Sequence, residues 1–275
     1  MGRSLRIALQ SELLRRARRG TPFPENRMDN NTNYYESNAS AFFASTVSVD
    51  MESLRSKFLT HVAPGGRILD AGCGSGRDAK AFAQQGFQVA AFDASPALAH
   101  LASEHCGFAI QVRTFDDVVE AEAYDGIWCC ASLLHIAATE IPRTLRALWR
   151  ALKPGGALYV SFKHGSGERS KDGRTFTDAD ESKIRDWLAR VSDLQHVEVW
   201  QTADARPDID EEWVNAIAVK SATPRRKLVT GGTDPFLPHL SKAMAAATDI
   251  AIAVSFVKTT GLRLLMPDLE NALRP

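Results

Sequence analysis

The chain has 275 residues, 44% of them hydrophobic and 24% charged, which excludes the disordered and fibrous classes. Its formal net charge at pH 7 is zero, so no global field would gather a nucleic acid, and we expect no such partner. No apolar run reaches about 18 residues and the 4 cysteines form no C-x-x-C pair, so we expect no membrane span, no disulfide framework and a cytoplasmic location.

Residues 1–27 are basic, with 7 Arg against 2 acidic residues. Leucines near helical spacing also fit an amphipathic helix at a membrane surface or a transit peptide, but the favoured interpretation is a disordered extension. We expect one folded domain over residues 28–220. The composition of 221–227 is typical of a linker, and 228–275 is expected to be a short α/β tail.

Strand and helix patterns alternate through the middle of the chain. Helices are expected between the strands, for example over 78–85 and 141–152, which predicts a parallel sheet with right-handed crossovers. The runs HVEVWQTAD and EEWVNAIAVK follow with no helix between them and predict an antiparallel hairpin. The expected fold is therefore α/β and Rossmann-like, with a seven-stranded, mostly parallel sheet and one antiparallel strand. The five parallel strands are predicted at Arg67–Ala71, Gln88–Asp93, Phe108–Arg113, Tyr124–Cys130 and Ala157–Lys163.

A glycine loop, AGCGSGRD, connects the first strand to the next helix. Its backbone N–H groups and the positive end of the helix suit an anionic or carbonyl-rich ligand. A dinucleotide fingerprint requires Gly or Ala at the sixth position, where Arg77 stands, and the Gly-Lys-Ser/Thr ending of a phosphate loop is absent. The loop therefore favours a different ligand.

Two acidic residues flank this loop. Asp70 lies inside the end of the first strand, where it would repel a diphosphate but could accept hydrogen bonds from an ammonium group. Asp93 ends the second strand, and an acid at that position can accept both hydroxyls of a ribose. A ligand with a ribose, an amino group and a carboxylate fits S-adenosylmethionine.

The order Asp-x-Gly-x-Gly-x-Gly between a strand and a helix resembles motif I of class I S-adenosylmethionine-dependent methyltransferases. YDGIWCCASLLHI and LKPGG extend the similarity over residues 34–220, and the tellurite-resistance-like subgroup is the most similar. The resemblance implies the class I methyltransferase fold and this cofactor, with the loop glycines against its methionine part, Asp70 at its amino group and Asp93 at its ribose. The cofactor-binding residues so implied are Tyr35, Asp70, Gly72, Cys73, Gly74, Gly76, Arg77, Asp93, Ala94, Ser95, Thr114, Phe115, Asp116, Ala131 and Ser132.

Methyl transfer needs an aligned nucleophile and the exclusion of water, and a general base only if the nucleophile arrives protonated. His135 follows the fourth strand and is the candidate catalytic residue, with packing at a helix start as the alternative. Tyr34 and Tyr35 precede the core. They are expected either in a lid over the cofactor, with Tyr34 toward the substrate, or in a helix packed at the sheet edge.

Residues 163–178, KHGSGERSKDGRTFTD, are predicted to form a long polar loop at the carboxyl end of the sheet. With Lys163, Arg169, Arg174 and Arg206 as substrate-binding candidates, this loop would form a cationic rim that favours an anionic small molecule. The alternative is an ordinary solvated surface. No metal site is expected.

The tail over 228–275 resembles the opening segment of a phospholipase-D-like nuclease domain, but no His-x-Lys follows. We interpret it as a truncated segment without nuclease activity that offers a surface to a protein partner. The expected function is methyl transfer to a small molecule. A non-catalytic cofactor-sensing or interaction module and an RNA or protein methyltransferase stay open as alternatives, and the acceptor atom is undetermined because strand four lacks Asn/Asp-Pro-Pro-aromatic.

Overall fold

The computed structural model describes residues 30–206 and 209–222. The chain divides into two units, Met1–Pro224 and Arg225–Pro275, and all described residues belong to the first. The expectations for residues 1–27 and for the tail over 228–275 lie outside the described residues, as does most of the linker.

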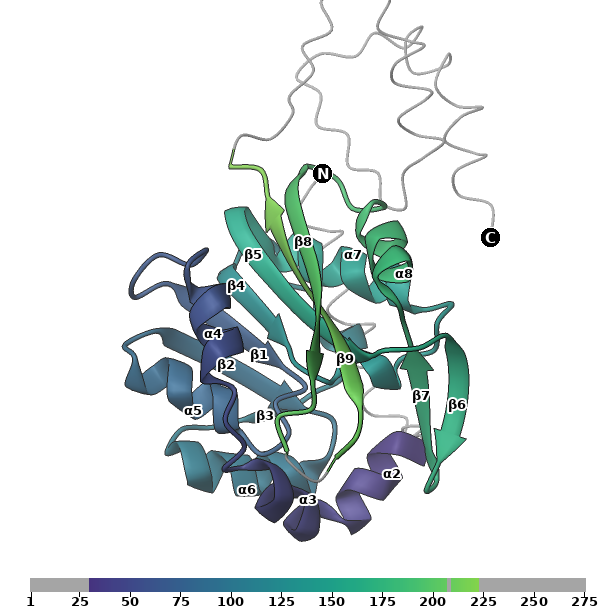
Figure 1. Ribbon diagram of the computed structural model, residues 1–275. Helices are drawn as coiled ribbons and strands as arrows, with labels where there is room; N and C mark the ends of the chain where they lie inside the picture. Colours follow the sequence, from purple (N-terminus) through teal and green to yellow (C-terminus); the bar gives the residue numbers. More distant parts are fainter. Residues whose placement is uncertain (1–29, 207–208, 223–275) are drawn as a thin grey trace, which may run out of the picture. The chain divides into compact units, whose positions relative to one another are not determined.

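A seven-stranded sheet forms the centre of this unit, with the strand order β3-β2-β1-β4-β5-β9-β8 (Figure 1). Neighbours from β3 to β5 pair in parallel, while β9 is antiparallel to both β5 and β8. The predicted sheet with one reversed strand is confirmed. The strands are β1 Arg67–Ala71, β2 Gln88–Asp93, β3 Gln111–Val112, β4 Tyr124–Cys129, β5 Leu152–Lys163, β8 Leu194–Ala203 and β9 Glu212–Lys220.

The bounds of β1 and β2 agree with the prediction, but two other strands differ. β3 is only 2 residues long because it lies at the sheet edge and pairs only with Phe92 and Asp93. β5 begins earlier than expected, since the LKPGG backbone already pairs with β4 through Leu152. Gly155 has a φ of 82°, which a residue with a side chain adopts only at a cost, so it permits this irregular entry.

Helices cover both faces of the sheet. On one face, Phe58 and Phe82 from α4 and α5 pack around Trp128 of β4, while α6 packs on β2. On the other face, α7 and α8 cover the larger core, with Leu148 and Trp187 among the buried side chains. Of the described helices, none combines the length and apolar character needed to cross a membrane. The helices on the two faces of the sheet are α4 Glu52–Leu59, α5 Arg77–Gln84, α6 Pro96–Cys106, α7 Ile141–Ala151 and α8 Glu181–Leu188.

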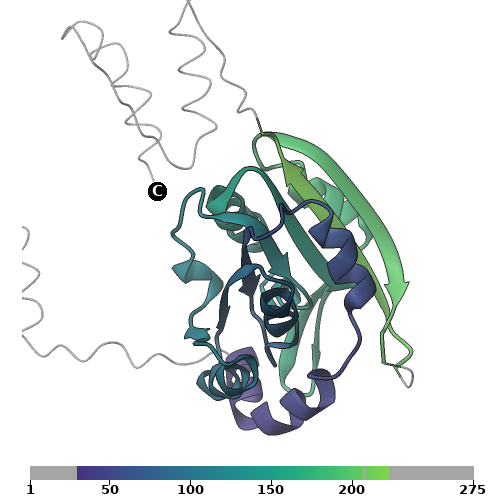
Figure 2. The ribbon, with the colours of Figure 1, turned by 90° about the vertical axis from the view of Figure 1, so that its left-hand side faces the viewer.

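Two further helices, α2 (Asn30–Ser37) and α3 (Ala39–Thr46), lie at the end of the sheet toward which the parallel strands point (Figures 1 and 2). Glu36 of α2 accepts hydrogen bonds from the Ser95 hydroxyl (2.6 Å) and the Ala97 backbone N–H (2.9 Å). A carboxylate at the first turn of α6 is favoured by the exposed N–H groups and the helix dipole there. This contact holds the N-terminal segment over the carboxyl ends of the strands.

The predicted polar loop over 163–178 is wrong, because most of it forms a β-hairpin. β6 (Gly167–Lys171) pairs antiparallel with β7 (Arg174–Asp178) beside α2 (Figure 1). Asp172 and Gly173 between them have φ values of 53° and 78°, as in the two-residue turns that match the twist of a hairpin. Asp-Gly is a strong sequence signal for that turn. Phe176 of β7 is buried and anchors the hairpin to the core.

Candidate active site

A cleft of about 730 Å³ opens at the carboxyl ends of the strands. The glycine loop, α3, the β6–β7 hairpin and the β8–β9 connection all contribute to its wall. The predicted site residues that line it are Tyr35, Gly72, Cys73, Gly74, Arg77, Ala131, His135, Lys163, Arg174 and Arg206. The others are absent from its lining: Tyr34, Asp70, Gly76, Asp93, Ala94, Ser95, Thr114, Phe115, Asp116, Ser132 and Arg169.

The three loop glycines have different structural roles. All have positive φ, at 73° for Gly72, 55° for Gly74 and 73° for Gly76. A Cβ on Gly72 would lie 2.6 Å from the Cβ of Ser132, and one on Gly76 would lie 2.7 Å from the Cys106 sulfur. Gly76 therefore lets the loop pack on α6, whereas Gly72 and Gly74 line the cleft. The contact of Gly76 with the cofactor stays a prediction.

Gly72→Ala is expected to destabilise the fold and weaken cofactor binding. A positive φ costs an alanine about 1–2 kcal/mol, and the overlap with Ser132 adds a further cost of about 1–3 kcal/mol. Gly86→Ala is the matched control, because Gly86 has a φ of 88° and open space around it, and so carries the backbone cost alone. Denaturant unfolding of both variants separates the two costs. Ser132→Gly should partly rescue Gly72→Ala, and additive effects in the double variant would contradict the overlap.

Asp93 organises the loop from the end of β2. Its two carboxylate oxygens accept the backbone N–H groups of Gly74 (2.9 Å) and Ser95 (3.0 Å). Burial raises the pKa of this carboxyl, and the backbone donors oppose that shift. The backbone N–H of Ala94 also acts on this carboxylate, and since an ionised carboxylate has about four acceptor positions, capacity remains for a ribose hydroxyl.

Asp70 is buried at the end of β1, with 3% of its surface exposed. Its Oδ2 and the hydroxyl of Ser132 are both buried without a hydrogen-bond partner among the described residues. Burial and the nearby Asp78 raise the pKa of Asp70 well above its usual range. An unpaired buried carboxylate oxygen below a glycine loop fits a ligand ammonium group or a bridging water, as S-adenosylmethionine would require.

Several residues predicted to contact the adenine have side chains that are engaged elsewhere, and their contacts with the cofactor stay predictions. Ser95 is buried, and its hydroxyl both donates to Glu36 and accepts from the Leu98 N–H as the cap of α6. Thr114 forms a capping box with Asp117, so its side chain is used locally. Asp116 is exposed and paired with Arg143 at 3.3 Å. These side chains serve local structure.

Phe115, unlike Thr114 and Asp116, packs close to the glycine loop. Its ring packs edge-on against Phe92, with centroids 5.5 Å apart. The tip of the ring comes within 3.7 Å of where a Cβ on Gly72 would lie. Phe115 therefore supports the glycine loop from the side of β2.

His135 and Tyr35 meet at the cleft wall. The Tyr35 hydroxyl lies 2.7 Å from Nε2 of His135, and Nδ1 of the same ring lies 3.1 Å from the carbonyl oxygen of Thr175. His135 thus touches the cleft, and it is more than a packed residue at a helix start. Tyr35 lines the same cleft as the glycine loop and contacts the candidate base, and its contact with the cofactor stays a prediction.

The cations predicted to form a rim are paired with acidic residues, so they give the cleft no excess of positive charge. Arg206 makes two hydrogen bonds to Asp204, at 2.9 and 2.8 Å, and Lys163 pairs with Glu211. Arg169 pairs with Asp178, away from the cleft. Among the described residues that line the cleft, five are Asp or Glu and five are Arg or Lys. The balance removes the reason to expect an anionic substrate.

Arg174 has the weakest of these pairings. Its Nη2 is 3.5 Å from the exposed Asp172, while its guanidinium lies over the ring of Tyr34 at 4.2 Å. Its Nε is buried without a hydrogen-bond partner in the described part of the chain. Arg174 also makes a side-chain hydrogen bond to Tyr35, so among the predicted four it is the cation with the longest carboxylate contact, but it is not free of partners.

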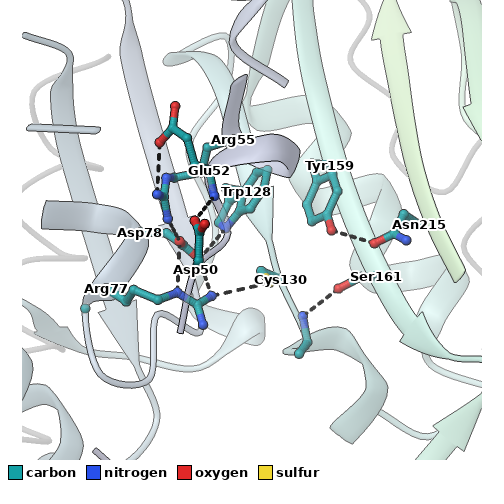
Figure 3. A network of polar contacts seen from close by, with 12 residues as sticks. Asp50, Glu52, Arg55, Arg77, Asp78, Trp128, Cys130, Tyr159, Ser161 and Asn215 are labelled. Carbon is teal, nitrogen blue, oxygen red and sulfur yellow. Dashed lines mark hydrogen bonds and ion pairs between the residues drawn. The ribbon is translucent and has the colours of Figure 1, made fainter. Parts of the chain in front are cut away.

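A buried ionic network lies beneath the loop (Figure 3). Asp78 accepts hydrogen bonds from Arg77 (2.6 Å), Arg55 (2.8 Å) and the Trp128 indole (3.0 Å). Burial alone would raise the pKa of Asp78, but the two arginines outweigh it and lower the pKa. Arg77 was predicted as a cofactor residue, and the structure shows that its guanidinium mainly holds Asp78. The sequence alone did not reveal Arg55 or Trp128, because both lie far along the chain.

Polar residues of β5 and β9, together with Cys130 directly after β4, add to the lining, and sequence reasoning missed them. The Tyr159 hydroxyl donates to Asn215 (2.7 Å), and the Ser161 hydroxyl accepts the Ala131 N–H (2.8 Å) (Figure 3). Cys130 lies beside them, and burial with the nearby Asp78 raises the pKa of its thiol to about 12. A thiol of that kind is protonated at neutral pH and is no nucleophile.

A family model described as a methyltransferase domain matches residues 43–205. The ubiquinone biosynthesis O-methyltransferase of Xanthomonas campestris is 33% identical over 105 residues, covering 36% of this chain and 43% of that protein. The protein of the same name from Xylella fastidiosa is 34% identical over 104 residues, covering 35% and 42%. The chain therefore matches less than half the length of these curated relatives.

Solved structures share the fold. The 1,6-didemethyltoxoflavin-N1-methyltransferase of Burkholderia thailandensis, solved with its substrate and S-adenosylhomocysteine, has a TM-score of 0.59 at 20% identity and covers 69% of this chain and 87% of that one. A methyltransferase from Methanosarcina mazei has a TM-score of 0.54 at 17% identity, covering 63% and 100%. Since the family match spans more than half of the 275 residues, the chain belongs to the methyltransferase-domain family.

Proposed function

We propose that this enzyme transfers a methyl group from S-adenosylmethionine to a hydroxyl oxygen of a small aromatic molecule. The observation that carries the proposal is a single cleft that joins the glycine loop to the His135–Tyr35 pair. A hydroxyl group arrives protonated, so it needs a base of this kind near the methyl group. The O-methyltransferase relatives point to the same acceptor atom.

The cofactor supplies an electrophilic methyl group when it is bound. On this chain, Gly72 and Gly74 would let the backbone approach it, Asp93 would accept its ribose hydroxyls, and Asp70 would face its amino group. Ala131 lines the same cleft at the end of β4, where we place the sulfonium end. These assignments rest on the positive φ angles, the remaining acceptor sites of Asp93 and the unpartnered oxygen of Asp70.

The cleft lining includes the aromatic residues Tyr159, Phe176 and Trp213 and polar groups such as Asn215. Aromatic side chains with a few polar groups suit a small, largely apolar molecule. Because acidic and basic residues balance, a neutral acceptor fits as well as an anionic one, and Arg174 is the residue that would hold a carboxylate. The tellurite-resistance-like subgroup and a partner at the C-terminal tail stay predictions.

A non-catalytic role is less favoured, because a binding module has no need of a base at the methyl end of its cleft. Methylation of RNA is less favoured because the formal net charge of the chain is zero, which gives no general attraction for a polyanion.

Turnover of the full chain with S-adenosylmethionine tests the proposal. The acceptors are catechol, 4-nitrocatechol and a panel of hydroxylated aromatic metabolites, with S-adenosylhomocysteine and methylated product detected by mass spectrometry. We expect product with at least one hydroxylated acceptor, and none from heat-denatured protein. Cofactor binding without product from any hydroxyl acceptor would contradict this function while leaving the family membership intact.

A further inference from the structure

The hydrogen bonds of His135 define which of its nitrogens carries the proton. A carbonyl oxygen can only accept, so the 3.1 Å contact with Thr175 places a hydrogen on Nδ1. In the neutral ring Nε2 is then an acceptor, and the Tyr35 hydroxyl, 2.7 Å away, must donate to it. The Tyr35 hydroxyl therefore lies between Nε2 of His135 and part of the cleft.

Helix α2 builds this arrangement from outside the sheet. Asn31 donates to the backbone carbonyl of His135 (3.1 Å) and accepts the N–H of Thr175 (2.7 Å), so one side chain bridges the two residues that orient the imidazole. One turn further along the same helix, Tyr35 supplies the hydroxyl. At its end, Glu36 anchors the helix to α6.

The surroundings of Tyr35 suit a transient change of charge. Its ring packs edge-on against Phe42, with centroids 4.9 Å apart, and the Arg174 guanidinium lies 5.9 Å from its centre. Burial raises the pKa of Tyr35, while Arg174 acts in the opposite direction. At rest the phenol is protonated, and a nearby cation stabilises any negative charge that develops on its oxygen.

We propose that Tyr35 is a catalytic residue that relays the acceptor's proton to His135. The hydroxyl proton of the acceptor passes to the Tyr35 oxygen as the Tyr35 proton passes to Nε2. The acceptor oxygen forms its bond to the methyl carbon while the carbon–sulfur bond breaks and leaves its electron pair on sulfur. The imidazolium formed on His135 keeps its hydrogen bond to Thr175. This inference rests on the proposed function, since only a protonated acceptor needs a relay.

The tautomer of His135 tests the geometry without any acceptor. Nitrogen NMR of the full chain with ¹⁵N-labelled histidine reports all 7 ring systems, and His135→Gln identifies the signal of interest. We expect hydrogen on Nδ1, and an Nε2 signal that shifts in Tyr35→Phe as its donor is lost. Tyr124→Phe is the matched control, because its hydroxyl contacts Glu120 away from the cleft. Hydrogen on Nε2, or no shift in Tyr35→Phe, would overturn the relay.

Turnover then separates a relay from a structural role. Tyr35→Phe should lower kcat for catechol by about 10²- to 10⁴-fold, the usual range for acid–base catalysis, with the Kd of the cofactor unchanged. The loss should be small for 4-nitrocatechol, whose hydroxyl is largely ionised at neutral pH. Equal losses for both acceptors would indicate positioning only and overturn the relay, whereas the absence of product from every hydroxyl acceptor would contradict the proposed function instead.

Discussion

Asp93→Ala is expected to weaken the binding of S-adenosylmethionine by at least about 10- to 150-fold. A hydrogen bond to a charged group contributes about 1.5–3 kcal/mol, and Kd changes tenfold for every 1.4 kcal/mol, so the loss of even one ribose contact has this effect. The variant also frees the N–H groups of Gly74 and Ser95, so the loop itself should lose order. Equilibrium dialysis with labelled cofactor measures the effect.

Asp93→Asn tests whether the charge and acceptor capacity of Asp93, and not only its shape, are required. The amide has the shape of the carboxylate, but its NH₂ group would face one of the two backbone N–H donors, so we expect it to bind nearly as poorly as the alanine variant. Asp186→Asn, on the exposed surface of α8, is the control and should bind as the parent does. If Asp93→Ala binds the cofactor as tightly as Asp186→Asn, Asp93 does not hold the ribose.

Asp78→Ala should produce the largest loss of stability, about 3–5 kcal/mol in the free energy of unfolding, because one partner of a buried ionic network is removed. The side chains of Arg55 and Arg77 are only 10% and 18% exposed, and Trp128 would lose its hydrogen-bond acceptor. Chemical denaturation at pH 7 measures the change. Glu52→Ala removes the exposed partner of the same Arg55 and should cost far less, so equal losses would contradict the network's role.

The pH dependence of this effect has a definite sign. The pKa of Asp78 is lowered in the fold, so its ionised form stabilises the protein above the unfolded value of about 3.9. That contribution is lost as the pH falls through the folded-state pKa. The difference in stability between the parent and Asp78→Ala should therefore be constant near neutrality and shrink below about pH 4. A difference that stays constant into the acid range would contradict the assignment.

The parts of the fold that local patterns determine were predictable. β1, β2 and the glycine loop have strong local signals, namely apolar runs that end in glycines and an acid. β3 was predicted too long because its apolar side chains do not reveal that it lies at the sheet edge. The hairpin after β5 was not predicted, although Asp172-Gly173 favours a two-residue hairpin turn. The charged residues around this turn are also typical of a polar loop.

The site was predictable only in part, since its side-chain contacts join distant segments. Glu36 meets Ser95 and Asn31 meets Thr175 across 59 and 144 positions, and no local pattern indicates such pairs. The cations predicted as a rim found acidic partners; for Lys163 this partner, Glu211, comes from another part of the chain. Arg77 and Asp78 were visible in the sequence, but their role depends on the buried Arg55.

We propose that the cleft at the end of β1 binds an aminoacyl nucleoside, and isothermal titration calorimetry of the intact chain measures this binding. S-adenosylhomocysteine should bind at one site per chain and NAD should give no heat, because Arg77 stands at the third glycine position of a dinucleotide fingerprint. If S-adenosylhomocysteine at millimolar concentration gives no heat with the folded protein, or if NAD binds saturably in its place, the cleft is not a site for an aminoacyl nucleoside.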